Sequence, residues 1–281
     1  PYVAREVIIA TNPDVITLDV EMPRMNGLQF LEKIMRLRPM PVIMVSTRTT
    51  EKSAAAIQAL SLGAVDCIDV TRLHDDAMAQ ERVSMVVRVA ARASVRAPVA
   101  TTRQAAPPPR NEMDWNGRIV LIGSSTGGVD ALETVFAAYP ERCPPTLVTQ
   151  HMPSAFLESF ARRLDEHFKP RVALAQEGER LEPGKILIAP GGTTHLTLGS
   201  FASKTVHLQA DDGSERHVPA VNRLFHSGIP YGRRILAVML TGMGRDGAEE
   251  MLALKNAGAE TIIQSARTCV VDGMPGAARA L

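Results

Sequence analysis

Short, wholly apolar runs alternate with amphipathic helical patterns along most of this chain, and this alternation limits the possible folds more than any other feature. The run Ile119–Ile122, for example, is followed by a glycine-rich turn and then by a helical pattern over Thr126–Ala138. Runs that are apolar on both faces are typical of strands in parallel sheets, because crossover helices cover both faces of such sheets. The chain is therefore predicted to have an α/β fold.

Two α/β regions are expected, with a linker between them. Residues 94–116 are rich in proline, alanine and arginine and show neither helical nor strand periodicity, which indicates a partly extended linker. At 281 residues the chain is long enough for two cores. We predict a smaller domain over residues 1–93, the linker over residues 94–116 and a larger domain over residues 117–281.

Both domains are predicted to be doubly wound, with strands and helices in alternation. In the smaller domain the expected strands are Val15–Leu18, Val42–Val45 and Val65–Ile68, and the expected helices are Leu28–Leu37, Lys52–Leu62 and Asp76–Ala93. In the larger domain the expected strands are Ile119–Ile122, Thr146–Thr149, Lys185–Ala189 and Leu236–Leu240, and the expected helices are Thr126–Ala138, Ser154–Glu166, Ala220–Ser227 and Gly247–Ala257. Alternating apolar residues over Thr194–Gln209 indicate an antiparallel hairpin inserted into this pattern.

Charge and cysteine content exclude several classes of protein. The 31 Lys and Arg residues balance 30 Asp and Glu residues without a long block of either sign, which argues against nucleic acid or a membrane surface as a partner. The apolar runs are strand-length, shorter than the ~20 residues of a membrane helix, so no membrane insertion is expected. Cys67, Cys143 and Cys269 lack the spacing of a zinc site or a disulfide framework, which fits a reducing cytoplasm.

Three polar residues follow three separate strand candidates. Ser125 comes after Ile119–Ile122, His151 comes after Thr146–Thr149, and Asp246 lies in a glycine-rich loop after Leu236–Leu240. The carboxyl ends of parallel strands meet at one edge of a sheet, so a nucleophile, a base and an orienting carboxylate could converge there. Backbone N–H groups near Met243 and at the start of the helix after Ser125 could stabilise an oxyanion.

Each residue alone also has a structural interpretation. Ser125 could cap a helix or cradle a phosphate, His151 could be a hydrogen-bonded structural residue, and Asp246 could cap the helix that begins at Gly247. The turn around Ser125 matches neither G-x-S-x-G nor G-x-G-x-x-G, which argues against an α/β-hydrolase elbow and weakens dinucleotide binding.

In the smaller domain, Asp19 ends a strand candidate and Ser46 ends the next one. An exposed carboxylate at a strand end can accept a phosphoryl group, and a neighbouring hydroxyl can bond a phosphate oxygen. From the residues alone, solvated loop residues are the favoured interpretation of both.

The motifs together resemble the CheB family of chemotaxis protein-glutamate methylesterases, which are response regulators. Leu18–Leu28 resembles a receiver phosphorylation loop. Five further segments resemble the esterase motifs in order: Gly123–Gly128, Thr149–Pro153, Ile188–Gly192, Leu240–Gly247 and Cys269–Pro275.

This resemblance implies a truncated flavodoxin-like receiver domain followed by a serine-hydrolase domain. It assigns Ser125 as nucleophile, His151 as general base and Asp246 as the residue that orients the imidazole, with Thr126 and Met243 at the oxyanion site. The substrates would be glutamate γ-methyl esters on methyl-accepting chemotaxis receptors, in the cytoplasm. Glutamines of the same receptors would be deamidated, and catalysis would need no cofactor.

For the receiver domain, the resemblance implies that Asp19 is phosphorylated by a histidine kinase phosphodonor with Mg²⁺, and that Ser46 is the switch hydroxyl. Phosphorylation would loosen the receiver from the esterase crevice.

The sequence departs from the family pattern at three points. Pro1–Glu6 matches the second receiver helix, so the acidic pair that holds Mg²⁺ is absent and no metal site is expected in this fragment. Val70 stands where a lysine is expected, and Gly276–Leu281 ends within the last esterase helix. We expect a marginally stable, association-prone receiver remnant, retained esterase activity and impaired switching.

Two rival hypotheses remain at this stage. One is a non-catalytic α/β signalling module that binds a partner or a phosphorylated ligand through the same glycine-rich turns. The other is a hydrolase of the same mechanism that acts on a receptor of another signalling pathway.

Overall fold

In the computed structural model, the chain divides into two compact units, Pro1–Gln104 and Ala105–Leu281. The structure describes residues 2–22, 24–46, 50–69, 77–93, 95, 115–200 and 203–281. Val70 and nearly all of the predicted linker therefore lie outside the described residues. Across the part of the chain that is described, none of the helices combines the length and the apolar character needed to cross a membrane.

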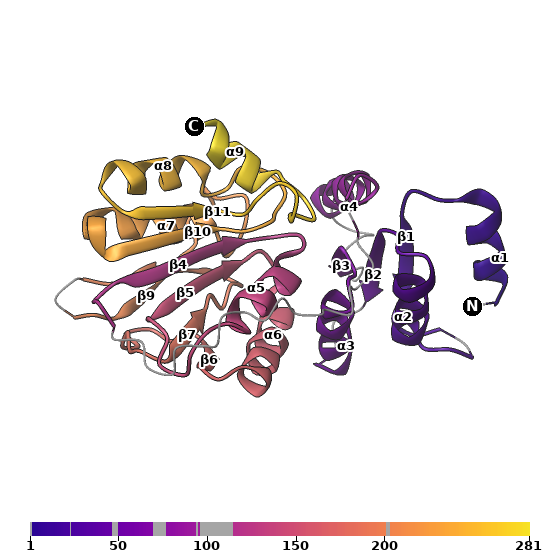
Figure 1. Ribbon diagram of the computed structural model, residues 1–281, viewed down its shortest axis with the longest axis horizontal. Helices are drawn as coiled ribbons and strands as arrows, with labels where there is room; N and C mark the ends of the chain where they lie inside the picture. The colour runs from indigo at the N-terminus through magenta and orange to yellow at the C-terminus, as the bar shows by residue number, and fades with distance from the viewer. Residues whose placement is uncertain are drawn as a thin grey trace. The chain divides into compact units, whose positions relative to one another are not determined.

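The N-terminal unit contains a three-stranded parallel sheet in the order β1-β2-β3, with helices between the strands (Figure 1). Fully buried Leu31, Ile43 and Ile57 come from α2, β2 and α3 and contribute to its core, so the apolar runs that predicted strands are buried as expected. The elements are α1 (Tyr2–Thr11), β1 (Ile16–Asp19), α2 (Gly27–Leu37), β2 (Val42–Ser46), α3 (Thr50–Ser61), β3 (Asp66–Asp69) and α4 (Ala77–Ala90).

The C-terminal unit is built on a six-stranded parallel sheet in the order β11-β10-β4-β5-β7-β6, with a separate antiparallel pair β8-β9. The predicted α/β class and the inserted hairpin are confirmed. The strands are β4 (Ile119–Ser124), β5 (Thr146–Gln150), β6 (Arg171–Leu174), β7 (Lys185–Ile188), β8 (Thr194–Leu198), β9 (Val206–Ala210), β10 (Ile235–Met239) and β11 (Glu260–Ile263). The helices are α5 (Gly128–Phe136), α6 (Ser154–His167), α7 (Val221–Gly228), the 3₁₀ helix η1 (Ile229–Arg234), α8 (Ala248–Asn256) and α9 (Met274–Ala280).

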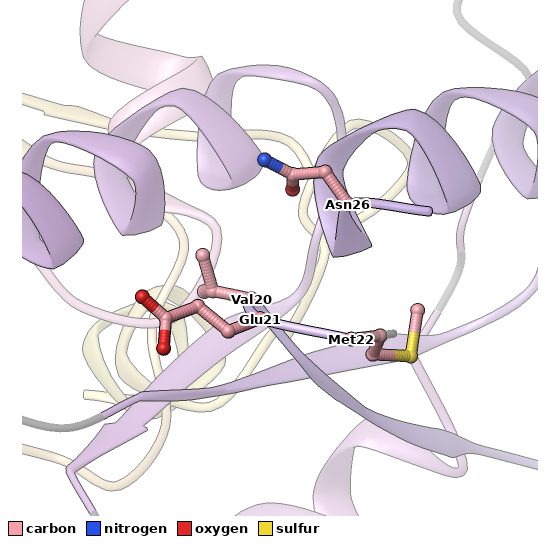
Figure 2. Close-up of a pocket in the computed structure, with 4 residues that line it drawn as sticks. All are labelled: Val20, Glu21, Met22 and Asn26. Atoms are coloured by element: carbon pink, nitrogen blue, oxygen red, sulfur yellow. The ribbon is translucent and has the colours of Figure 1, made fainter. Parts of the chain in front are cut away.

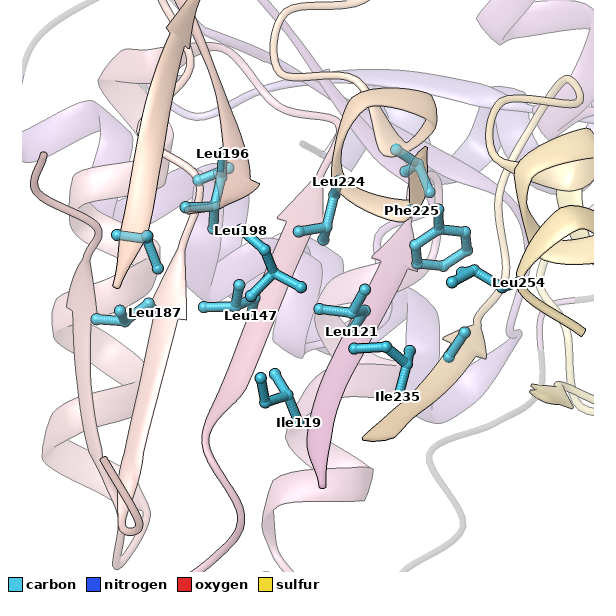
Figure 3. Close-up of a cluster of buried hydrophobic side chains, with 14 of the residues drawn as sticks. Ile119, Leu121, Leu147, Leu187, Leu196, Leu198, Leu224, Phe225, Ile235 and Leu254 are labelled. Atoms are coloured by element: carbon cyan, nitrogen blue, oxygen red, sulfur yellow. The ribbon is translucent and has the colours of Figure 1, made fainter. Parts of the chain in front are cut away.

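Helices cover both faces of the six-stranded sheet (Figure 1). On one face, Leu121 of β4 and Leu147 of β5 lie in one apolar cluster with Leu224 and Phe225 of α7 (Figure 3). Side chains alternate between the faces of a strand, so the buried neighbours of Leu121 and Leu147 point to the opposite face, toward α5 and α6. Burial on both faces explains why these strands read as continuous apolar runs.

The C-terminal unit differs from the sequence prediction in its edge strands and at the start of α5. The edge strands β6 and β11 were not predicted, because they are short and only partly buried. Helix α5 begins at Gly128 rather than at Thr126, since Gly127 has a positive φ of 78° and ends the turn. Thr126 therefore lies in the turn between β4 and α5 and not in the first helical turn.

Candidate functional site

The strand order brings the ends of β10, β4 and β5 side by side, with β4 in the middle. Met239 pairs with Gly123 and Ser124 pairs with Gln150 in the parallel registers. Ser125 and His151 are the next residues along their strands, and the His151 N–H donates to the Ser124 carbonyl at 3.0 Å. The predicted nucleophile and base thus follow directly from neighbouring strand ends.

His151 and Asp246 are in direct contact. Nε2 of His151 lies 2.6 Å from Oδ2 of Asp246, and both side chains are almost fully buried. Burial by itself raises the pKa of Asp246, but the hydrogen bond from His151, together with two backbone N–H donors, outweighs it and holds the pKa below its ordinary value. The carboxylate is therefore ionised at neutral pH and accepts a hydrogen bond from Nε2–H.

The same carboxylate also receives the first N–H groups of α7. The N–H of Val221 donates to Oδ2 at 2.7 Å and that of Asn222 donates to Oδ1 at 2.8 Å. Asn222 Oδ1 in turn accepts the N–H of Gly247 at 2.6 Å, just before α8. Asp246 therefore caps α7, 25 residues earlier in the chain, and not the helix that follows it, which corrects the structural alternative derived from the sequence. The amino end of a helix favours this negative charge.

The second imidazole nitrogen of His151 faces a different environment. Nδ1 is buried and has no hydrogen-bond partner among the described residues, so the Ser125 hydroxyl is not bonded to it in this structure. With the proton on Nε2, neutral Nδ1 carries a lone pair that can accept a proton. Ser125 is half-buried, and its main-chain N–H donates to the Thr241 carbonyl oxygen at 3.0 Å. A hydrogen bond between a serine hydroxyl and its general base commonly tightens only when substrate binds.

The two predicted oxyanion residues lie in loops that pack against one another. Thr126 is buried and its carbonyl accepts the Thr241 hydroxyl at 3.0 Å, while Met243 is half-buried in the adjoining loop. A Cβ on Gly242 would overlap the sulfur of Met274 and lie 2.8 Å from Ser125 Cβ. Glycine is therefore required where this loop passes Ser125.

Sequence reasoning missed three polar side chains around this site. His217 stacks on His151, with ring centroids 4.2 Å apart and an interplanar angle of 25°. Gln150 lies inside a quoted motif but was not singled out, although it is buried and hydrogen-bonded to the chain on both sides of the site. Asn222 carried no visible signal, because its cap of Gly247 depends on the approach of two helices.

The predicted phosphorylation residues belong to the N-terminal unit. Asp19 is exposed at the end of β1, and its Oδ1 accepts the Glu21 N–H at 3.1 Å. Its register partner is Val45, so Ser46 follows at the same edge of the sheet. The loop after Asp19 forms an open hollow of about 370 Å³ (Figure 2), lined among described residues by Val20, Glu21, Met22 and Asn26.

A Mg²⁺ site can be tested against the side chains near Asp19. Among the residues that the structure describes, no three His, Cys, Asp or Glu side chains cluster closely enough to hold a metal ion. We therefore derive no step through the ion from the described residues around Asp19.

Comparison with known proteins covers both units. Residues 120–281 match the family described as CheB methylesterase, and residues 2–72 match the response regulator receiver domain. A protein-glutamate methylesterase/protein-glutamine glutaminase 1 of Caulobacter vibrioides is 49% identical over 99% of this chain and 81% of that protein. The corresponding protein of Bordetella parapertussis is 46% identical over 100% of this chain and 82% of its own length.

A solved structure also resembles part of this chain. The crystal structure of the Thermotoga maritima CheB methylesterase catalytic domain aligns with a TM-score of 0.56 at 38% identity. The alignment covers 59% of this chain and 89% of the Thermotoga maritima chain.

Proposed function

Because the chain belongs to the CheB methylesterase family and carries a receiver domain before its esterase domain, it is a hydrolase of esters and amides, and we propose that Ser125, His151 and Asp246 perform its chemistry. The substrate is a glutamate γ-methyl ester on the cytoplasmic helices of a methyl-accepting chemotaxis receptor, and the protein acts in the cytoplasm. Glutamine side chains of the same receptors are deamidated by the same residues.

In the first half of the reaction, Ser125 Oγ attacks the ester carbonyl carbon and forms the new C–O bond. Nδ1 of His151 takes the hydroxyl proton and then delivers it to the departing methoxide, which leaves as methanol. Asp246 holds Nε2–H, so that Nδ1 is the free, basic nitrogen, and stabilises the imidazolium that forms. With a glutamine substrate, the proton goes to the amide nitrogen and ammonia leaves.

In the second half, a water molecule attacks the glutamyl-serine ester. His151 takes one proton from this water and returns it to Ser125 Oγ as the C–O bond to serine breaks, which releases the glutamate carboxylate. In each tetrahedral intermediate, the oxyanion accepts hydrogen bonds from the backbone N–H groups of Thr126 and Met243.

The receiver domain controls access to this reaction. Asp19 is proposed as the residue phosphorylated by a histidine kinase phosphodonor, and Ser46 as the hydroxyl that bonds the phosphate. The exposed carboxylate at the end of β1 and the register that sets Ser46 at the same sheet edge support this assignment. A receiver domain is consistent with Mg²⁺-dependent phosphorylation. In a phosphate-transfer assay, an Asp19→Asn variant should therefore incorporate no phosphate.

The contact between His151 and Asp246 at the strand ends, directly beside Ser125, is the observation that carries the catalytic proposal. The test is methanol release from a receptor carrying radiolabelled methyl esters. The wild-type protein should release volatile label, and Ser125→Ala should release none while still binding the receptor. Equal methanol release by both proteins would overturn the assignment, and receptor binding without turnover by either would favour the non-catalytic signalling module.

A further inference from the structure

Gln150 occupies a buried position between the proposed nucleophile and the proposed base. It is the last residue of β5, and its side chain is 3% exposed. Its amide nitrogen lies 2.9 Å from the Ser125 carbonyl oxygen and 3.1 Å from the His151 carbonyl oxygen. One side chain therefore ties together the main chain on both sides of the site.

The orientation of this amide follows from its partners. Two backbone carbonyls can only accept hydrogen bonds, so the NH₂ group must face them, and its two hydrogens serve one carbonyl each. The amide oxygen then accepts the hydroxyl of Ser124 at 2.6 Å, and Ser124 is fully buried. Every polar atom of the Gln150 amide is hydrogen-bonded, which holds the group in a single orientation.

The neighbouring backbone leaves room for this arrangement. A Cβ on Gly128 would overlap the Gln150 amide oxygen and lie 2.9 Å from Ser124 Cβ. The Gly128 N–H also donates to the Ser125 carbonyl at 2.7 Å. Glycine at this position thus allows both donors, Gln150 and Gly128, to reach the same carbonyl oxygen.

Fixing the Ser125 carbonyl also fixes the N–H of the next residue. The Ser125–Thr126 peptide is planar and trans, because the described cis bond is that between Val218 and Pro219, and in a trans peptide the C=O and N–H point in opposite directions. A carbonyl held by Gln150 on one side therefore aims the Thr126 N–H to the other side. This N–H is the oxyanion donor in the function proposed above.

We propose that Gln150 is a positioning residue that sets the direction of the Thr126 N–H and the main-chain position of His151. This inference rests on the proposed function, since it assumes attack by Ser125 and an oxyanion at Thr126. The Gln150 side chain itself does not contact substrate. Its removal should weaken stabilisation of the transition state more than binding of the ester.

The experiment compares Gln150→Leu with Thr149→Val in the full chain. Leucine keeps much of the volume but donates no hydrogen bond. Thr149 is the preceding residue of β5, and its hydroxyl is buried without a hydrogen-bond partner among the described residues, so Thr149→Val is a matched control. We measure kcat and KM for methanol release, the thermal melt, and the affinity for a receptor peptide in which glutamate is replaced by its γ-semialdehyde.

The semialdehyde separates positioning of the oxyanion donor from a general loss of structure. Its adduct with a serine hydroxyl carries an oxygen at the oxyanion position, so its affinity follows transition-state stabilisation. Loss of one oxyanion donor lowers kcat about 10²–10³-fold. A misdirected donor should lower kcat less than a missing donor does, so Gln150→Leu should lower kcat by about 10- to 100-fold. Its KM should stay within about twofold of the wild-type value. Its affinity for the semialdehyde peptide should fall by the same factor as kcat/KM. Thr149→Val should match wild type.

The inference is wrong if Gln150→Leu retains wild-type kcat, or if kcat falls while the semialdehyde binds as tightly as before. If Gln150→Leu does not fold, Ser124→Ala decides, because it removes only the donor to the amide oxygen. Its kcat should fall about threefold at unchanged KM, and an unchanged kcat also overturns the inference. The proposed function fails separately, when wild type and Ser125→Ala release methanol equally.

Discussion

The imidazole of His217 stacks on the imidazole of His151, with ring centroids 4.2 Å apart. In the proposed mechanism His151 becomes an imidazolium during turnover, and a flat ring against it would support the cation and keep water from its face. His217→Ala should therefore lower kcat by about 10-fold, whereas His217→Phe, which keeps an aromatic face, should retain most of the activity. Steady-state kinetics on methylated receptor checks this. Equal losses in both variants would show that a polar contact of His217, and not its ring, is what matters.

The buried carboxylate of Asp246 should make stability depend on pH. Its pKa in the folded protein lies below the ordinary value, so ionised Asp246 stabilises the fold fully above the ordinary value of about 4. This contribution is lost as the pH falls through the lower, folded pKa. Asp246→Asn should therefore unfold with about 2 kcal/mol less free energy at pH 7, and the difference from wild type should shrink below about pH 4.

Urea unfolding followed by tryptophan fluorescence reports on the unit of the chain that contains Asp246. Trp115 is the single tryptophan of the sequence and lies in the C-terminal unit. A difference between wild type and Asp246→Asn that stays constant from pH 7 into the acidic range would contradict the assigned pKa direction.

Gly242 should tolerate no side chain. Its backbone carbonyl accepts the N–H groups of Gly273 and Met274 at 3.0 and 2.9 Å, and a Cβ there would push against Ser125. Gly242→Ala should lower kcat at least about 100-fold, because a displacement of about 1 Å at the nucleophile is enough for such a loss. Gly276→Ala in α9 is the control, since a Cβ there makes only ordinary contacts, at 3.5 Å or more, with the Asp272 carboxylate and needs no positive φ. Similar kinetics in the two variants would show that Gly242 is not required by the site.

Asn222 should couple the two helices that hold Asp246. Its side-chain oxygen accepts the Gly247 N–H at 2.6 Å, and its amide nitrogen donates to Glu215 at 3.1 Å. Loss of such a cap costs about 1 kcal/mol, so Asn222→Ala should lower the free energy of unfolding by that amount and reduce kcat several-fold. Asn256→Ala, exposed at the other end of α8, should change neither. Unaltered kcat in Asn222→Ala, together with lower stability, would confine Asn222 to a structural role.

The strand ends of the site could be predicted because the central strands are buried on both faces. All residues of β4 and β5 are buried, so their apolar runs stand out in the sequence, and parallel pairing then brings Ser125 and His151 to one edge. The edge strands could not be predicted in the same way. In β11 the burial of successive residues alternates between exposed and intermediate, and a four-residue run of this kind is ambiguous in sequence.

The partners of the site residues were beyond sequence reasoning, because they depend on how separate elements approach each other. Asp246 precedes a helix and reads as its cap, yet its carboxylate binds the N–H groups of Val221 and Asn222. Gln150 reads as the end of a strand, and its bonds to two carbonyls become visible only in three dimensions. The predicted roles of Asp19 and Ser46 stay predictions that phosphate-transfer experiments can test.

The most direct test of the central claim is mass spectrometry of the protein after rapid acid quenching of its reaction with a methylated receptor peptide. A nucleophilic Ser125 predicts a transient adduct on the peptide containing Ser125, with a mass equal to the receptor peptide less methanol. Rapid methanol release with an unmodified Ser125 at every quench time, and undiminished turnover in Ser125→Ala, would contradict it.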